Sequence, residues 1–235
     1  MGIHKFTLRR MSIQKQADSY DRNWEKYSKI ITEGKVTPLK EDITYLGKKF
    51  YGKDNPPFIT ALVPVSSKIW KVLQQIQADF ERIDPRQHFF HPIYFHITLN
   101  ELGREDQINL KEIYVKMREI LSDINPFKLE IRGLNCFNYM IYAQVFDEEE
   151  ILFIIDELMH KQLPFLKPRI RKKIPHISIT EIKTNEARNL IETIEKKYRE
   201  IEIGVIDVDE IQIVAARPYL TVGAFEVIER FSLVK

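Results

Sequence analysis

The sequence predicts an α+β fold of two lobes, in which two pseudo-symmetric repeats place antiparallel-type sheets around a central cleft, with helices outside. From residue 58 to residue 233, runs that alternate apolar and polar residues take turns with runs of helical period. The order strand, helix, strand, helix, strand occurs twice, over about 58–133 and about 139–217. A histidine strand stands at the corresponding place in each repeat and carries His96 or His176, which indicates an internal duplication.

The first repeat contains five predicted elements: a strand at 58–65, a helix capped by Ser66 or Ser67, the histidine strand at 92–100, a helix at about 105–123 and a strand at 127–133. The first of these helices has apolar residues at 3.6 spacing, namely Ile69, Val72, Leu73, Ile76 and Phe80. The strand at 127–133, FKLEIRG, alternates apolar and charged residues, as expected of a half-buried strand.

The second repeat has the same order: a strand at 139–146, a helix at 147–163, the histidine strand at 174–180, a helix from about 184 to 197 and strands at 201–208 and 210–216. The helix at 147–163 has carboxylates in its first turn, where the helix dipole favours them. The alternating segment FEVIERFSL, at 225–233, predicts a closing strand.

Residues 1–57 differ from the rest and predict an N-terminal arm laid on a main domain that covers 58–235. A helix is expected at 19–32, followed by a stretch rich in Lys, Gly and Pro.

Composition restricts the class of protein. The 235 residues carry a net charge of +2, so an anionic ligand would need a local site rather than a generally basic surface. Cys136 is the only cysteine, which excludes an internal disulfide and fits a reducing cytoplasm. No run of 18 apolar residues and no apolar leader occurs, so we expect a cytoplasmic protein without a membrane span. The oligomeric state stays open, and a monomer is compatible with the sequence.

The two histidine strands, PIYFHITLN and IPHISIT, share the pattern His-x-Thr/Ser-x. Alternate side chains of a strand share a face, so His96 lies with Thr98 and His176 with Ser178. If the lobes face each other, two imidazoles and two hydroxyls surround a space about the size of a phosphate. Histidine can act as acid or base near neutral pH, and hydroxyls can hold phosphate oxygens. This set predicts displacement at phosphorus without a metal or other cofactor.

The paired motifs resemble those of the two-histidine (2H) phosphoesterase superfamily, which includes 2'-5' RNA ligase-like proteins and cyclic nucleotide phosphodiesterases. The resemblance covers about 58–233 and implies a bilobal fold with metal-independent chemistry on RNA or nucleotide phosphodiesters. The leading activity that it implies is opening of a 2',3'-cyclic phosphate to a 2'-phosphate. By position, His96 and His176 match the catalytic pair, and Thr98 and Ser178 match the phosphate-holding hydroxyls.

Other functions stay open at the level of sequence. Within the enzymes, these are hydrolysis of 2'-5' linked or cyclic oligonucleotides and ligation of RNA ends. From another class comes a module that binds RNA ends without turnover, although binding alone would not require two titratable imidazoles.

Further candidates lie near the motifs. The basic run KPRIRKK precedes the second motif, and Arg171 and Lys173 are its best candidates for clamping a polyanion. Tyr94 and Tyr219 could stack on a base. His88, His91 and His96 lie close in sequence, but their spacing is not that of a zinc site, and no metal is expected.

Overall fold

The computed structural model describes residues 13–36, 56–166, 174–216 and 225–233. In this part of the chain the strands are β1 (Phe58–Pro64), β2 (His88–Phe89), β3 (His96–Arg104), β4 (Phe127–Cys136), β5 (Met140–Phe146), β6 (His176–Glu181), β7 (Glu202–Val208), β8 (Glu210–Ala216) and β9 (Phe225–Ser232). The helices are α1 (Ile13–Thr32), α2 (Ser67–Ile83), α3 (Leu110–Leu121), α4 (Ile151–Gln162) and α5 (Arg188–Thr193). Short 3-10 turns occur at Pro92–Tyr94 and Glu105–Gln107, and α5 continues as a π-helical turn at Ile194–Tyr198.

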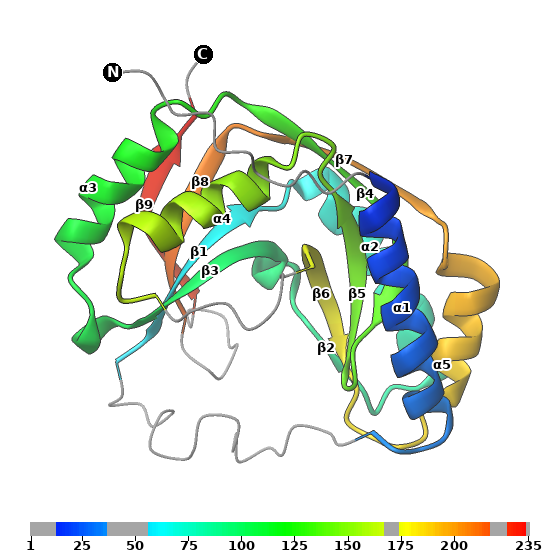
Figure 1. Cartoon of the computed structure of the whole chain (residues 1–235). Helices are drawn as coiled ribbons and strands as arrows, with labels where there is room; N and C mark the ends of the chain where they lie inside the picture. Colours follow the sequence, from blue (N-terminus) through cyan, green and yellow to red (C-terminus); the bar gives the residue numbers. More distant parts are fainter. Residues whose placement is uncertain (1–12, 37–55, 167–173, 217–224, 234–235) are drawn as a thin grey trace.

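The described strands form two antiparallel sheets (Figure 1). One sheet has four strands in the order β3-β1-β8-β9, and the other has five in the order β2-β6-β5-β4-β7. Figure 1 shows β3 and β6 next to each other where the two sheets meet, and Cα atoms of the two strands approach within 8 Å. The α+β class with antiparallel sheets is confirmed.

The two halves of the sequence are interleaved, which the repeat pattern did not reveal. The last strand of the first half, β4, pairs with β5 and β7 of the second half. In return, β8 crosses back and pairs with β1. Each sheet therefore contains strands from both halves.

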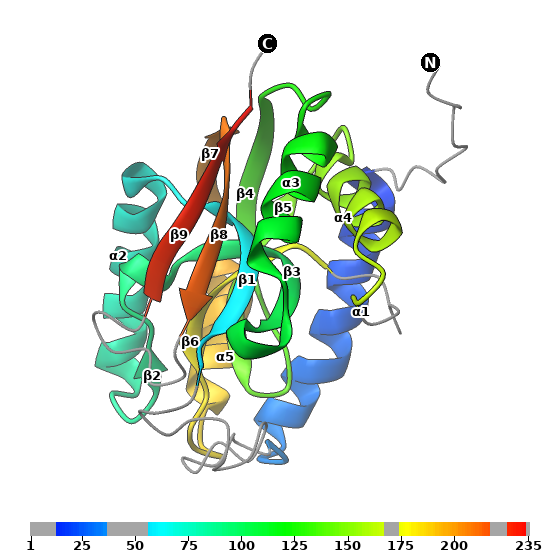
Figure 2. The same cartoon turned by 90° about the vertical axis from the view of Figure 1, so that its left-hand side faces the viewer.

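The helices cross over in the same way. Helix α2 of the first half packs against β6 and β7, while α4 of the second half packs against β3 and α3. Figure 2 shows α2 on one side of the strands and α3 with α4 on the other. Apolar residues of both sheets and their helices form one continuous core, including Ile69 of α2, Ile113 of α3 and Ile155 of α4, all fully buried. This shared core makes the positions of β3 and β6 depend on both halves of the chain.

Several element boundaries differ from the predictions: α3 begins at Leu110 rather than about residue 105, α5 begins at Arg188 rather than about residue 184, and β4 continues to Cys136. Helix α1 begins at Ile13 rather than residue 19. Helix α4 begins at Ile151, so the carboxylates expected in its first turn precede it; Asp147 Oδ2 instead accepts a hydrogen bond from Leu152 N at 2.7 Å. The predicted strand at 92–100 was wrong over its first residues, because Pro92 has no N–H for a sheet ladder and starts a 3-10 turn.

None of the helices in the described residues is both long and apolar enough to span a bilayer. The division of the chain at residue 57 stays a prediction.

Candidate active site

The two motif strands, β3 and β6, have equivalent ladders. His96 pairs with Pro64 and Thr98 with Leu62 in the β3–β1 ladder. His176 pairs with Gln144 and Ser178 with Tyr142 in the β6–β5 ladder. In both motifs, the histidine and the hydroxyl residue pair with two residues of the neighbouring strand that are themselves two positions apart.

Both ladders also change register at the same place. After Thr98, the next pair is Asn100 with Ala61, and after Ser178 it is Thr180 with Ile141. The two irregularities come one residue after each motif hydroxyl, where a bulge bends a strand and increases its twist. The repetition therefore extends from the sequence to the local backbone of the motifs.

Burial alternates along both motifs as the sequence predicts. Ile97 and Leu99 are buried, while His96 and Thr98 between them are half-buried. In the second motif, Ile177 and Ile179 are buried, whereas His176 and Ser178 are half-buried. The apolar side chains anchor each strand in the core, and each His and its hydroxyl residue lie together on the opposite face.

Each imidazole makes the same hydrogen bond, to the backbone carbonyl of the residue two positions earlier. His96 Nδ1 lies 2.7 Å from Tyr94 O, and His176 Nδ1 lies 2.8 Å from Ile174 O. A carbonyl oxygen can only accept, so Nδ1 is the donor in both rings. In a neutral imidazole this assigns the lone pair to Nε2, the atom that can take a proton from a reactant.

The Nε2 atom of His96 already has a hydroxyl neighbour. It lies 3.0 Å from Thr98 Oγ1, so with Nδ1 protonated the Thr98 hydroxyl donates to Nε2. Burial lowers the pKa of His96, and the hydrogen bond to the Tyr94 carbonyl offsets part of this effect. The neutral imidazole is therefore favoured at His96.

Aromatic rings flank both histidines. The His176 ring lies 5.0 Å from that of Phe137 and 5.2 Å from that of Tyr142, in edge-on arrangements. The His96 ring lies 5.9 Å from that of Phe225. These contacts limit rotation of the imidazoles about their side-chain bonds.

Each motif strand is hydrogen-bonded to a polar side chain of a helix from the other half of the sequence. Gln77 of α2 donates to the carbonyl of Ile179 in β6, at 2.6 Å. In the other direction, Asn100 of β3 donates to Asp156 of α4, at 2.7 Å. Each motif strand is thus bonded to a helix of the other half, a relationship that a sequence pattern does not reveal.

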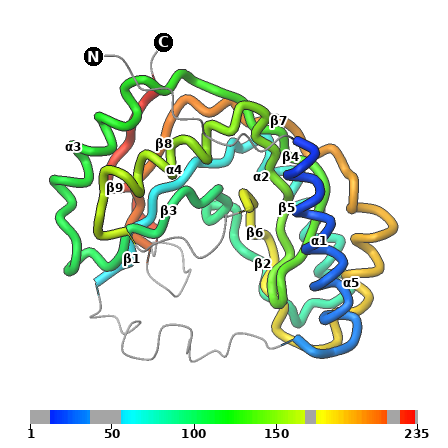
Figure 3. Tube along the Cα trace, in the orientation of Figure 1, coloured from blue at the N-terminus to red at the C-terminus, as the bar shows by residue number. Residues whose placement is uncertain are grey.

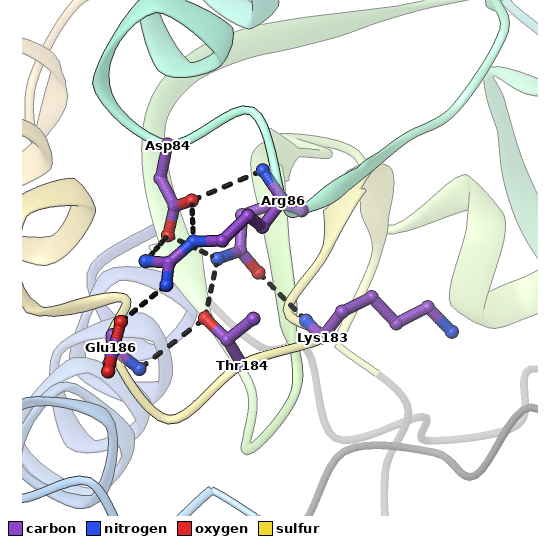
Figure 4. Close-up of polar contacts among 6 residues, drawn as sticks. Asp84, Arg86, Lys183, Thr184 and Glu186 are labelled. Atoms are coloured by element: carbon purple, nitrogen blue, oxygen red, sulfur yellow. Dashed lines mark hydrogen bonds and ion pairs between the residues drawn. The ribbon is translucent and has the colours of Figure 1, made fainter.

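A polar network holds the segment that follows β6 to the loop between α2 and β2 (Figure 4). The buried Asp84 carboxylate accepts from Arg86 Nε at 2.8 Å and from Gln87 Nε2 at 2.6 Å. Gln87 also donates to Thr184 Oγ1 at 2.9 Å and accepts from Lys183 N at 2.8 Å. The hydrogen bond from Arg86 is the main reason why the pKa of Asp84 is lowered. This network fixes the chain that follows the second motif.

The remaining candidates divide into two groups. Arg171, Lys173 and Tyr219 lie outside the described residues. Tyr94 lies in the 3-10 turn rather than on β3, with only 6% of its surface exposed and its ring 5.8 Å from that of Phe225. The backbone carbonyl of Tyr94 accepts the hydrogen bond from His96 Nδ1. This role does not involve the tyrosine side chain, so the residue type does not indicate it. Among the described residues, no three His, Cys, Asp or Glu side chains are grouped as metal ligands would be.

Two antiparallel sheets, each with a strand of the form His-x-Thr/Ser-x, define the class of the two-histidine phosphoesterases. Within that class, the chain belongs to the 2'-5' RNA ligase superfamily, whose family model matches residues 63–219. This match spans about two thirds of the chain and contains both motifs.

Curated relatives and solved structures agree with this assignment. The RNA 2',3'-cyclic phosphodiesterase of Methanothermobacter thermautotrophicus is 23% identical over 146 residues, which cover 60% of this chain and 79% of the relative. The enzyme of the same name from Aquifex aeolicus is 23% identical over 150 residues, with the same two coverages. The crystal structure of Escherichia coli LigT complexed with 3'-AMP superposes with a TM-score of 0.59 at 13% identity, covering 77% of this chain and all of LigT. At that identity the structural likeness shows the fold.

Proposed function

We propose that this protein is a metal-independent phosphodiesterase that opens 2',3'-cyclic phosphates at RNA ends or on nucleotides to 2'-phosphates. His96 and His176 are the acid–base pair, and Thr98 and Ser178 hold the phosphate between the two motifs. The proposal is supported by membership of the superfamily and by the names of the two curated relatives.

One observation carries the assignment of the histidines. Both Nδ1 atoms are bonded to backbone carbonyls, so both rings present Nε2 as the atom that exchanges a proton with a reactant. Acid–base catalysis needs the reactive nitrogen held in a known place, and a hydrogen bond at Nδ1 fixes both the ring and its tautomer.

The reaction then proceeds in one displacement. One imidazole accepts at Nε2 a proton from the water molecule whose oxygen attacks phosphorus. As the new P–O bond forms, the bond from phosphorus to O3' breaks, and the other imidazole donates its Nε2 proton to O3'. The products are a 2'-phosphate and a 3'-hydroxyl, and solvent restores the two protonation states.

The hydroxyls complete the site. Thr98 Oγ1 is 3.0 Å from His96 Nε2, so the hydroxyl can turn from the imidazole to a non-bridging phosphate oxygen. Ser178 holds the equivalent position in the second motif. Two such donors stabilise the negative charge that develops on the phosphoryl oxygens.

The experiment is hydrolysis of a 2',3'-cyclic mononucleotide in the presence of EDTA, followed by phosphorus NMR. We expect the wild-type protein to form the 2'-nucleotide. His96→Ala and His176→Ala should each lower turnover by about a thousandfold, the range of a lost general acid or base. His88→Ala is the matched control, since His88 is exposed and lies on β2.

Undiminished turnover in both single variants would refute the catalytic pair. A 3'-nucleotide product would overturn the proposed direction of ring opening. A parallel reaction with a 2'-5' linked dinucleotide tests the alternative substrate, and RNA affinity without turnover on either compound would identify a binding module.

We also propose a cytoplasmic location. The sole cysteine, Cys136, is buried as a free thiol on β4, as is common in a reducing compartment.

A further inference from the structure

Helix α1 lies outside the part of the chain that matches the superfamily model, yet it packs beside the second motif. The match begins at residue 63, whereas α1 covers Ile13–Thr32. The helix contacts β4, β5 and α5 and runs along the five-stranded sheet (Figure 3).

Tyr20 brings its hydroxyl to the place where the β5–β6 ladder ends. The last pair of that ladder is Gln144 with His176. The next residues in this register are Val145 and Pro175, and Pro175 has no N–H to donate. The Tyr20 hydroxyl lies 3.1 Å from Val145 N, 2.7 Å from Val145 O and 2.5 Å from Pro175 O. It accepts from the Val145 N–H and has one proton to donate to the two carbonyls.

The Tyr20 side chain is held firmly enough for this role. Only 1% of its surface is exposed, and its ring lies 5.1 Å from that of Phe146 and 6.4 Å from that of Tyr142. Burial raises the pKa of Tyr20 well above its ordinary value, so the hydroxyl keeps its proton near neutral pH. The phenol thus replaces a strand partner at the point where Pro175 interrupts the ladder.

The residues that Tyr20 holds are those that orient His176. His176 Nδ1 donates to the carbonyl of Ile174. The Tyr20 hydroxyl lies at the carbonyl of Pro175, the residue between Ile174 and His176 in the chain. A shift of the 174–175 backbone would therefore move the acceptor that fixes the imidazole and its tautomer.

The first motif does not need such a brace. Its Tyr94 carbonyl belongs to a 3-10 turn closed by hydrogen bonds from Tyr94 N to His91 O and from Phe95 N to Pro92 O, both 2.9 Å. This local turn holds the carbonyl that binds His96. In the described residues, Tyr20 of α1 holds the backbone next to the carbonyl that binds His176.

We infer that Tyr20 is a positioning residue for His176, supplied by an N-terminal helix that lies outside the residues matching the family model. It keeps Nε2 of His176 directed at the phosphate by fixing the backbone from Ile174 to His176. This inference rests on the catalytic role proposed for His176.

The test compares three variants of the full chain. Tyr20→Phe removes the hydroxyl alone. Tyr27→Phe is the matched control, because Tyr27 lies on the same helix and its ring contacts Phe137 edge-on. Gln16→Ala is the structural control, since the two hydrogen bonds between Gln16 and Asp147 hold α1 on the sheet without involving Pro175. Thermal unfolding is measured first, and all variants are compared at a temperature at which each is folded.

Two readouts separate positioning from general stability. We expect Tyr20→Phe to lower kcat by about tenfold with little change in KM, because the reacting nitrogen is misplaced rather than binding lost. In long-range proton–nitrogen NMR of the histidine rings, the Nδ1–H form of His176 should give way to a tautomer mixture, while His96 is unchanged. Tyr27→Phe and Gln16→Ala should retain wild-type values of both.

Wild-type kcat and an unchanged His176 tautomer in Tyr20→Phe would overturn the inference, as would the same loss in Gln16→Ala. If the wild-type protein hydrolyses no cyclic phosphate, the proposed function fails, but the NMR comparison still tests the brace.

Discussion

His96 and His176, one in each motif, are held by the same hydrogen bond, from Nδ1 to the carbonyl of the residue two positions earlier. The backbone around the two acceptors differs, since Tyr94 lies in a 3-10 turn whereas Ile174 lies just before a strand. Different local backbones therefore produce the same Nδ1 hydrogen bond twice, which is expected where the tautomer itself is needed.

The lowered pKa of His96 predicts how this residue titrates. An unperturbed histidine titrates near pH 6.5, and burial moves the folded value of His96 below that. Protonation therefore favours the unfolded chain, so the contribution of His96 to stability is complete above about pH 6.5. It falls as the pH is lowered towards the folded pKa and levels off below it.

NMR titration should place the midpoint of His96 below about 6.5. Denaturant unfolding from pH 7 to pH 5 should show a weaker pH dependence in His96→Gln than in the wild-type protein. A midpoint at or above the ordinary histidine value would contradict the described environment of the ring.

The hydroxyls provide a second prediction. Thr98→Val keeps the shape of the side chain but removes the donor that lies 3.0 Å from His96 Nε2. We expect kcat/KM to fall by about a hundredfold, as for loss of one donor to a developing oxyanion. Ser178→Ala should have a similar effect.

Thr98→Ser is the control for this prediction, because it retains the hydroxyl and should stay close to wild type. Steady-state kinetics on a 2',3'-cyclic mononucleotide give the comparison. If Thr98→Val retained full activity, the hydroxyl would have no part in binding the phosphate.

The network around Asp84 predicts a stability change remote from the chemistry. Asp84→Ala leaves Gln87 and the half-exposed Arg86 without their buried acceptor. We expect the free energy of unfolding at pH 7 to fall by about 2 kcal/mol, as for loss of hydrogen bonds to a charged group. Arg82→Ala, at the exposed end of α2, should change it by less than about 0.5 kcal/mol.

The same network has a defined pH dependence. The pKa of Asp84 is lowered in the folded state, mainly by Arg86, so its contribution is present above the unfolded value of about 3.9 and is lost as the pH falls through the folded pKa. The difference between wild type and Asp84→Ala should therefore shrink in acid. An equal difference at pH 7 and at pH 3 would show that the charge of Asp84 is not what stabilises the loop.

The sequence was sufficient where structure depends on neighbours along the chain. The alternation of His96, Ile97, Thr98 and Leu99 predicts which side chains are buried, since strand geometry fixes this locally. The turn at Pro92–Tyr94 was missed because the apolar pattern outweighed the missing N–H of Pro92.

The features that sequence could not provide are long-range. Strands β4 and β8 have patterns that suit either sheet, so their exchange between the halves depends on tertiary packing. The hydroxyl of Tyr20 meets Pro175 across 155 positions of the chain, and no local pattern marks that contact. The catalytic candidates were therefore predictable as a pair of motifs, but the structures that hold them were not.

The central claim is that His96 and His176 act on one phosphate. A crystal structure of the protein with a nucleoside 2'-monophosphate tests it most directly. We predict that Nε2 of both rings lies within hydrogen-bonding distance of the same phosphate group, about 3 Å from its oxygens, with the Thr98 and Ser178 hydroxyls on non-bridging oxygens. A phosphate bound by one histidine while the other ring points away from it would contradict the account.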